Sequence, residues 1–135
     1  MSEDWNYFSK DAAYSAVLRD RLLNKVEMDS AKSIGKYMDT HFDGDLDVVD
    51  FGSGPGHYLP VLRNSYTHGK IKYTGVDIDT TNIDYAKKYF ADDPDSHFFV
   101  GSVLEPEAVS FGGNCVMSAN TLPHIPTIRP LLQWI

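Results

Sequence analysis

Three glycines stand at alternate positions near the middle of the chain, in the stretch DFGSGPGHY at residues 50–58. They follow the apolar pair Val48-Val49, which is typical of a strand. Glycine accepts positive φ and lets a ligand approach the backbone closely, so such a turn predicts a ligand site at the end of a strand. A tight strand-to-helix turn without a ligand would need fewer glycines.

The residues around these glycines discriminate between ligand classes. A phosphate-binding P-loop ends in Gly-Lys-Ser/Thr, whereas this turn ends in Gly56-His57-Tyr58, which excludes that class. The dinucleotide fingerprint needs a small residue where His57 stands. Asp50, at the base of the turn, would repel a pyrophosphate and attract a sulfonium or ammonium group. The turn therefore favours a cationic ligand, and an NAD-binding domain is the weaker alternative.

A second acidic residue, Asp77, ends the next apolar run. It follows Gly56 by about 20 residues, the spacing expected of a carboxylate that binds ribose hydroxyls. A carboxylate can accept hydrogen bonds from both hydroxyls of a ribose. The alternative is a turn or capping residue before the following helix. We expect Asp79, two residues on, to be the solvated member of the pair.

Apolar runs and helical spacing predict the elements that would position these residues. The predicted strands are 45–52, 70–78, 97–102 and 115–120, and helices alternate with them at 57–66, 80–91 and 127–135. Two helical pieces precede them within residues 4–42. We expect Asp29 or Ser30 to cap the second piece, and Thr80 or Thr81 to cap the helix at 80–91. Strands that alternate with helices predict an α/β fold with a parallel sheet and right-handed crossovers.

Four stretches resemble the successive motifs of class I, Rossmann-like S-adenosylmethionine-dependent methyltransferases. They are DVVDFGSGPGHY, YTGVDID, FFVGSVLE and CVMSANTLPH, and the resemblance covers roughly residues 45–124. It implies a Rossmann-like sheet in the order 3-2-1-4 with helices on both faces, and S-adenosylmethionine as the cofactor. The expected organisation is a single domain, with a helical cap at 1–42 and an α/β core at 43–135 that is incomplete at its C-terminus.

The resemblance also implies which residues would contact the cofactor. Asp50 and the glycine turn would line its methionine side, and Asp77 would hold the ribose, with Ile78 against the adenine. Ser102 stands where the family usually has an aspartate at the adenine edge. The implied cofactor-binding residues are Asp50, Gly52, Ser53, Gly54, Gly56, Asp77, Ile78, Ser102, Val103, Asn120 and Tyr14, the last being a tyrosine that would reach the cofactor carboxylate.

Asn120 and His124 are the catalytic candidates. Asn120 would face the reacting methyl group, and His124 would act as general base for a hydroxyl or amine acceptor. The alternative for His124 is a loop histidine that orders its own backbone. Tyr14 also has an alternative, because aromatic residues at helical spacing usually pack in a core.

Composition limits the partners. The formal net charge is −7 and the basic residues are scattered, which argues against nucleic acid. A single cysteine allows no intramolecular disulfide, and His41, His68 and His97 share no metal-ligand spacing. No apolar stretch approaches the roughly 20 residues of a membrane span. The N-terminus, MSEDWNYF, lacks a secretory pattern, so a cytoplasmic location is expected.

The leading prediction is methyl transfer to a small-molecule acceptor. The alternative from another class is a non-catalytic module that binds the cofactor or a partner, because class I methyltransferases usually continue through three further strands. The fourth predicted strand would form an open apolar edge. Either the chain is a piece of a longer protein, or a second copy covers this edge in a homo-oligomer.

Overall fold

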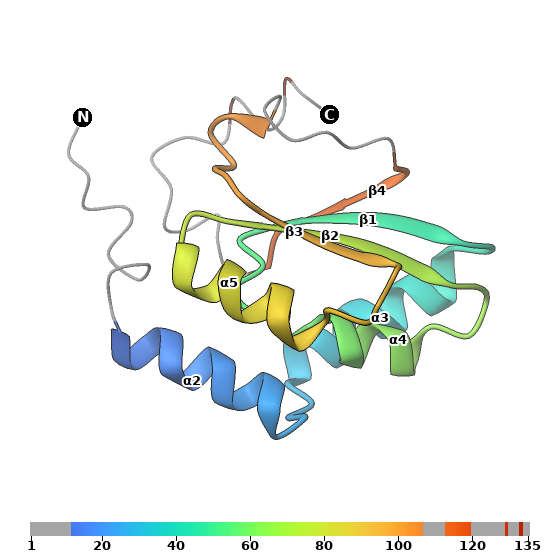
Figure 1. Cartoon of the computed structure of the whole chain (residues 1–135). Coiled ribbons are helices and arrows are strands. Elements are labelled where there is room, and N and C mark those ends of the chain that lie inside the picture. Colours follow the sequence, from blue (N-terminus) through green and yellow to red (C-terminus); the bar gives the residue numbers. More distant parts are fainter. Residues whose placement is uncertain (1–11, 107–112, 120–128, 130–132, 134–135) are drawn as a thin grey trace.

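A parallel four-stranded sheet forms the centre of the computed structural model, which describes residues 12–106, 113–119, 129 and 133 (Figure 1). Its strands are β1 (Leu46–Phe51), β2 (Ile71–Asp77), β3 (Ser96–Val100) and β4 (Cys115–Met117). They lie in the order β3-β2-β1-β4. The predicted α/β class and the predicted strand order are therefore confirmed.

All strand pairs are parallel, so the carboxyl ends of the strands meet at one edge of the sheet. Leu46 of β1 lies opposite Ile71 of β2, and Phe51 lies opposite Val76. β1 is almost wholly buried, as expected of a strand covered on both faces. The glycine turn after β1 and Asp77 at the end of β2 consequently leave the sheet side by side.

Four helices lie on one face of this sheet (Figure 1). They are α2 (Ala12–Leu23), α3 (Asp29–His41), α4 (Leu59–Ser65) and α5 (Thr80–Tyr89). Of the helix predicted at 127–135, only residues 129 and 133 are described.

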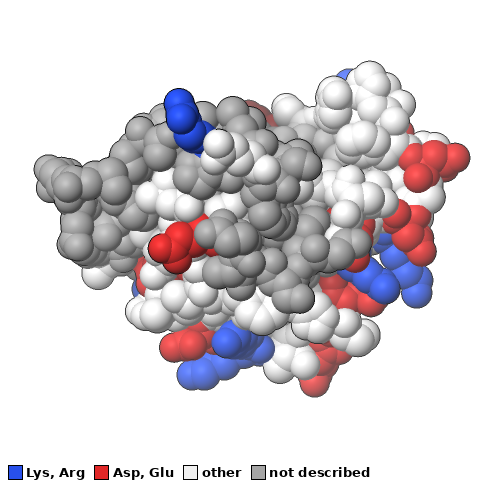
Figure 2. Space-filling view, turned by 90° about the horizontal axis from the view of Figure 1, so that it is seen from above, with Lys and Arg blue, Asp and Glu red and all other residues white. Residues whose placement is uncertain are grey.

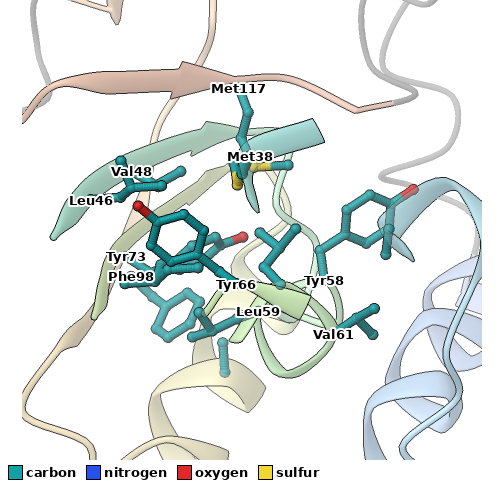
Figure 3. Close-up of a cluster of buried hydrophobic side chains, with 14 of the residues drawn as sticks. Met38, Leu46, Val48, Tyr58, Leu59, Val61, Tyr66, Tyr73, Phe98 and Met117 are labelled. Atoms are coloured by element: carbon teal, nitrogen blue, oxygen red, sulfur yellow. The ribbon is translucent and has the colours of Figure 1, made fainter. Parts of the chain in front are cut away.

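The main core lies between the sheet and these helices. Figure 3 shows Val48, Tyr73 and Phe98 of the sheet gathered with Leu59 of α4. Burial of such side chains contributes about 1.5–3 kcal/mol each. A second, smaller cluster on the opposite face consists of Val49, Phe51, Val76 and Val103.

Two predicted helix caps are wrong. Met28 precedes α3 without a side-chain cap, and the Ser30 hydroxyl instead lies 2.6 Å from the hydroxyl of Tyr58. At α5 the cap is Asp79, which accepts hydrogen bonds from the backbone N–H of Thr81 at 2.9 Å and of Asn82 at 3.3 Å. A carboxylate one position earlier reaches the free N–H groups of the first turn, so neither Thr80 nor Thr81 is needed.

Candidate functional site

The glycine turn leaves β1 with backbone angles that favour glycine. Gly52, Gly54 and Gly56 have φ values of 84°, 57° and 82°. A Cβ on residue 56 would also stand 2.9 Å from a ring carbon of Phe98. Part of the glycine requirement is therefore structural, because the turn must lie close to the aromatic core beneath it.

The Asp77 carboxylate binds this turn directly. Its Oδ2 accepts a hydrogen bond from the Gly54 N–H at 2.8 Å, and its Oδ1 accepts one from the Asp79 N–H at 2.8 Å. Each carboxylate oxygen can accept a further hydrogen bond, so both stay able to bind a ligand hydroxyl. The pKa of Asp77 is raised, mainly by burial, and the backbone N–H groups of Asp79, Gly54 and Ile78 oppose that shift. Asp77 thus also orders the turn before the next helix, which is the alternative role that the sequence indicated for it.

Asp50 lies inside β1 and is fully buried against β2. Its Oδ2 accepts a hydrogen bond from the Tyr73 hydroxyl at 2.5 Å, while Oδ1 has no partner among the described residues. Burial raises the pKa of Asp50 to about 7, against the Tyr73 hydrogen bond, and the nearby charge of Asp77 adds to the rise. A cation placed near this carboxyl would favour its ionised form.

His57 packs on the turn instead of pointing to solvent. Its ring is nine-tenths buried, 5.0 Å from the ring of Tyr58, and its Nδ1 has no described partner. Burial lowers the pKa of His57 to about 4, and the charge of Arg21 adds to this effect. His57 is therefore neutral at physiological pH and packs beside Gly54.

The other predicted residues are placed as follows. Ser53 is buried in the turn and donates to the Gly54 carbonyl at 3.2 Å. Ile78 directly follows Asp77 and is half-buried. Ser102 follows β3, where its hydroxyl accepts from the Leu104 N–H at 3.0 Å, and Val103 is buried.

The structure brings the turn after β3 beside the turns that follow β1 and β2. The Gly101 N–H donates to the Asp77 carbonyl at 3.0 Å, so Ser102 begins a turn adjacent to Asp77. Tyr14 lies on α2 with 38% of its surface exposed. Asn120 and His124 lie outside the described residues, so their proposed roles stay predictions.

Asp79 is the residue that sequence reasoning misjudged. It is buried, not solvated, and besides capping α5 it accepts a hydrogen bond from the Ser15 hydroxyl of α2 at 2.8 Å. The local pattern of an aspartate before Thr-Thr-Asn could have indicated the cap. Nothing local indicated the contact with Ser15.

The arrangement suits a nucleoside with a cationic substituent better than a diphosphate. A buried carboxyl, Asp50, and a half-buried one, Asp77, stand at the ends of β1 and β2, and one oxygen of Asp50 has no described partner. Within the described ranges, no group of three or more His, Cys, Asp or Glu side chains could hold a metal ion. The residues present therefore fit the cofactor that the sequence resemblance implied.

A family model for a methyltransferase domain matches residues 48–135, well over half of the chain. The chain belongs to this methyltransferase family. The match starts within β1 and includes the glycine turn and Asp77, the residues whose geometry is described above. No curated protein sequence matches this chain significantly.

Solved structures have the same fold as this methyltransferase domain. A putative S-adenosylmethionine-dependent methyltransferase from Methanococcus maripaludis is 15% identical with a TM-score of 0.68, over 98% of this chain and 60% of its own. A putative methyltransferase from Haloferax volcanii, solved with the activator Trm112, is 19% identical with a TM-score of 0.65, over 98% and 54%. The plantazolicin methyltransferase BpumL, solved with S-adenosylhomocysteine, is 15% identical with a TM-score of 0.66, over 96% and 50%.

These comparisons confirm the predicted family, with its Rossmann-like fold and its cofactor S-adenosylmethionine. This methyltransferase domain spans only 60%, 54% and 50% of the three matched chains. None of the helices formed by the described residues has the length and apolarity that a membrane span requires.

Proposed function

We propose that this chain binds S-adenosylmethionine at the carboxyl ends of β1 and β2 and transfers its methyl group to a small-molecule acceptor. The observation that carries the proposal is the contact between Asp77 and the Gly54 N–H, at 2.8 Å. This contact holds the Asp77 carboxylate, whose oxygens can accept further hydrogen bonds, next to the backbone of a glycine. A ribose can then meet the carboxylate while the nucleoside lies on the turn.

Each residue of the site has a defined task in this proposal. Asp77 accepts the ribose hydroxyls, and Asp50 provides negative charge toward a cationic ligand. Neutral His57 packs beside Gly54 and excludes water from the turn. The bound cofactor supplies an electrophilic methyl group, so the protein has mainly to position the reactants and to keep water out. His124 as general base, and Asn120 beside the methyl group, remain part of the proposal.

The charge distribution supports a small acceptor over nucleic acid. Figure 2 shows Lys and Arg side chains standing beside Asp and Glu on the described part of this face, not gathered into one field. A formal net charge of −7 disfavours binding to the phosphate backbone of a nucleic acid. Cytoplasmic action is part of the same proposal.

Calorimetric titration with S-adenosylmethionine, S-adenosylhomocysteine and NAD tests the binding step. We expect the first two to bind, and Asp77→Asn to weaken binding about 10- to 100-fold, because a hydrogen bond to a charged group contributes about 1.5–3 kcal/mol. Asp84→Asn, an exposed change on α5, is the matched control. Circular dichroism of each variant checks that the fold is kept.

Two results would contradict this proposal. Binding of NAD without S-adenosylmethionine would assign the turn to a dinucleotide. Binding of S-adenosylmethionine without formation of S-adenosylhomocysteine, across amine, hydroxyl, thiol and carboxylate acceptors, would indicate a non-catalytic cofactor-binding module.

A further inference from the structure

The helix α2 contacts the candidate site through a narrow strip of side chains. Its buried residues are Ser15, Leu18 and Leu22, which share one helical face because they are three and four positions apart. Most of the remaining helix is exposed, including the apolar residues Val17 and Leu23. α2 therefore packs against the domain through this face.

One of these contacts is a buried hydrogen bond. The Ser15 hydroxyl donates to Oδ2 of Asp79 at 2.8 Å, and 4% of Ser15 and 8% of Asp79 are exposed. The side-chain amide of Asn82 donates to the same oxygen at 3.3 Å, and Arg19 of α2 donates to that amide's oxygen at 3.3 Å. α2 is thereby joined to the first turn of α5.

Capping alone does not explain an aspartate at position 79. Serine or asparagine caps a helix about as well as aspartate, without the cost of burying a charge. In Asp79 only Oδ1 serves the cap, while Oδ2 accepts from Ser15 and Asn82. The second oxygen is what connects the cap to α2.

α2 also touches both residues that orient Asp77. Those residues are Asp79 and Gly54, whose N–H groups donate to the two oxygens of the Asp77 carboxylate. Ser15 binds Asp79, and a methyl carbon of Leu18 lies 3.3 Å from the point where a Cβ of residue 54 would stand. A displacement of α2 would therefore move the donors that fix the Asp77 carboxylate.

We propose that Ser15 and Asp79 are positioning residues for the cofactor: their hydrogen bond docks α2 and so holds Asp77 in the orientation that accepts the ribose hydroxyls. The inference rests on the proposed function and adds two residues to its site. Neither residue touches the ribose. Both act through the backbone N–H of residue 79.

The test compares two ligands, S-adenosylhomocysteine and its 2′-deoxyribose analogue, by calorimetry. The native chain is expected to prefer the ligand with the complete ribose. Ser15→Ala is expected to reduce that preference by about fivefold, the size of one hydrogen bond. Ser33→Ala, the same change at an exposed position of α3, should leave the preference unchanged.

A second variant distinguishes the loss of this hydrogen bond from a general loss of stability. Asp79→Ser keeps a good helix cap but is too short to reach Ser15. It should reduce the ribose preference like Ser15→Ala, and the double variant should be no worse than the stronger single one, because both remove the same hydrogen bond.

The outcomes separate this inference from the function on which it rests. Failure of the native chain to bind S-adenosylhomocysteine removes the proposed function, and the inference with it. If the native chain binds with a ribose preference, two results overturn the inference alone. One is an equal loss of affinity for both ligands in Ser15→Ala and Asp79→Ser, and the other is additive loss in the double variant.

Discussion

Asp50 is a carboxyl group buried in the middle of a parallel sheet, and its protonation links stability to pH. Its pKa in the folded chain is about 7, well above its ordinary value of 3.8, with burial as the main cause. The folded state keeps the proton up to about pH 7, while the unfolded chain releases it near pH 4. The stabilising contribution of this group is thus complete below pH 4 and is lost as the pH rises through 7.

The variant Asp50→Asn tests this linkage. Asparagine cannot ionise, and its carbonyl oxygen can still accept the hydrogen bond from Tyr73. Between pH 4 and pH 8, we expect the free energy of unfolding of the variant to rise relative to the native chain, by up to about 4 kcal/mol. Urea denaturation at several pH values measures the difference.

The comparison with the native chain is needed because His57 acts in the opposite direction. Its folded pKa of about 4 lies below the ordinary 6.5, so its contribution is present above pH 6.5 and is lost as the pH falls through 4. Both chains carry His57, so its effect cancels in the difference. A difference that stayed constant with pH would show that Asp50 is ionised throughout.

At the scale of elements, α3 and α4 pack tightly against each other. A Cβ on Gly35 of α3 would stand 2.5 Å from the Cβ of Ser65, at the end of α4. Real Cβ atoms do not approach so closely, so the two helices can lie at this separation only with a glycine at position 35.

Gly35→Ala therefore sets two effects against each other. Alanine favours a helix over glycine by about 1 kcal/mol. Overpacking costs about 1–3 kcal/mol, and here the obstacle is a Cβ, which cannot turn aside. We expect a net loss of stability in urea denaturation, and recovery when Ser65→Gly is added. Higher stability of the single variant would contradict the observed helix separation.

Much of this fold can be predicted from the sequence because it follows from local patterns. The apolar runs around Val48 and Val76 gave the strands, and the glycines gave the turn, because side-chain burial and positive φ are local properties. The family resemblance supplied the strand order, and it placed Asp50 and Asp77 at one edge of the sheet.

The errors concern contacts between residues far apart in the chain. Asp79 was expected to be solvated, whereas it is buried and binds Ser15, 64 residues away. The hydrogen bond from Tyr73 to Asp50 depends on the register of β1 against β2, which no local pattern specifies. Local propensity can therefore place a carboxylate at the site without revealing what it binds.

At the scale of the whole molecule, β4 offers an edge for association. It pairs with β1 on one side, and no strand within the described ranges pairs with its other side. Unpaired strand edges bind other strands through their free N–H and C=O groups. We therefore predict that the chain self-associates through β4, with sedimentation coefficients that rise with concentration.

The opposite edge of the sheet supplies the control. β3 exposes Phe99 and Val100, so a dimer through β3 is the competing arrangement. Phe99→Lys places a charge on that edge and should leave association through β4 intact. A strictly monomeric profile at high concentration would contradict the prediction, and association abolished by Phe99→Lys would assign it to β3.

The sequence separation of the paired strands favours one order of sheet assembly. The N–H of Lys70 reaches Asp45, 25 residues away, at the start of the β1–β2 pair, whereas Asn114 and Asp47, which join β4 to β1, are 67 residues apart. Closing a loop costs roughly 0.6 kcal/mol more for each doubling of its length. Refolding should therefore join β1 to β2 before β4 is added. In that order of folding, the edge of the sheet that carries Asp77 and the glycine turn forms before β4 is added.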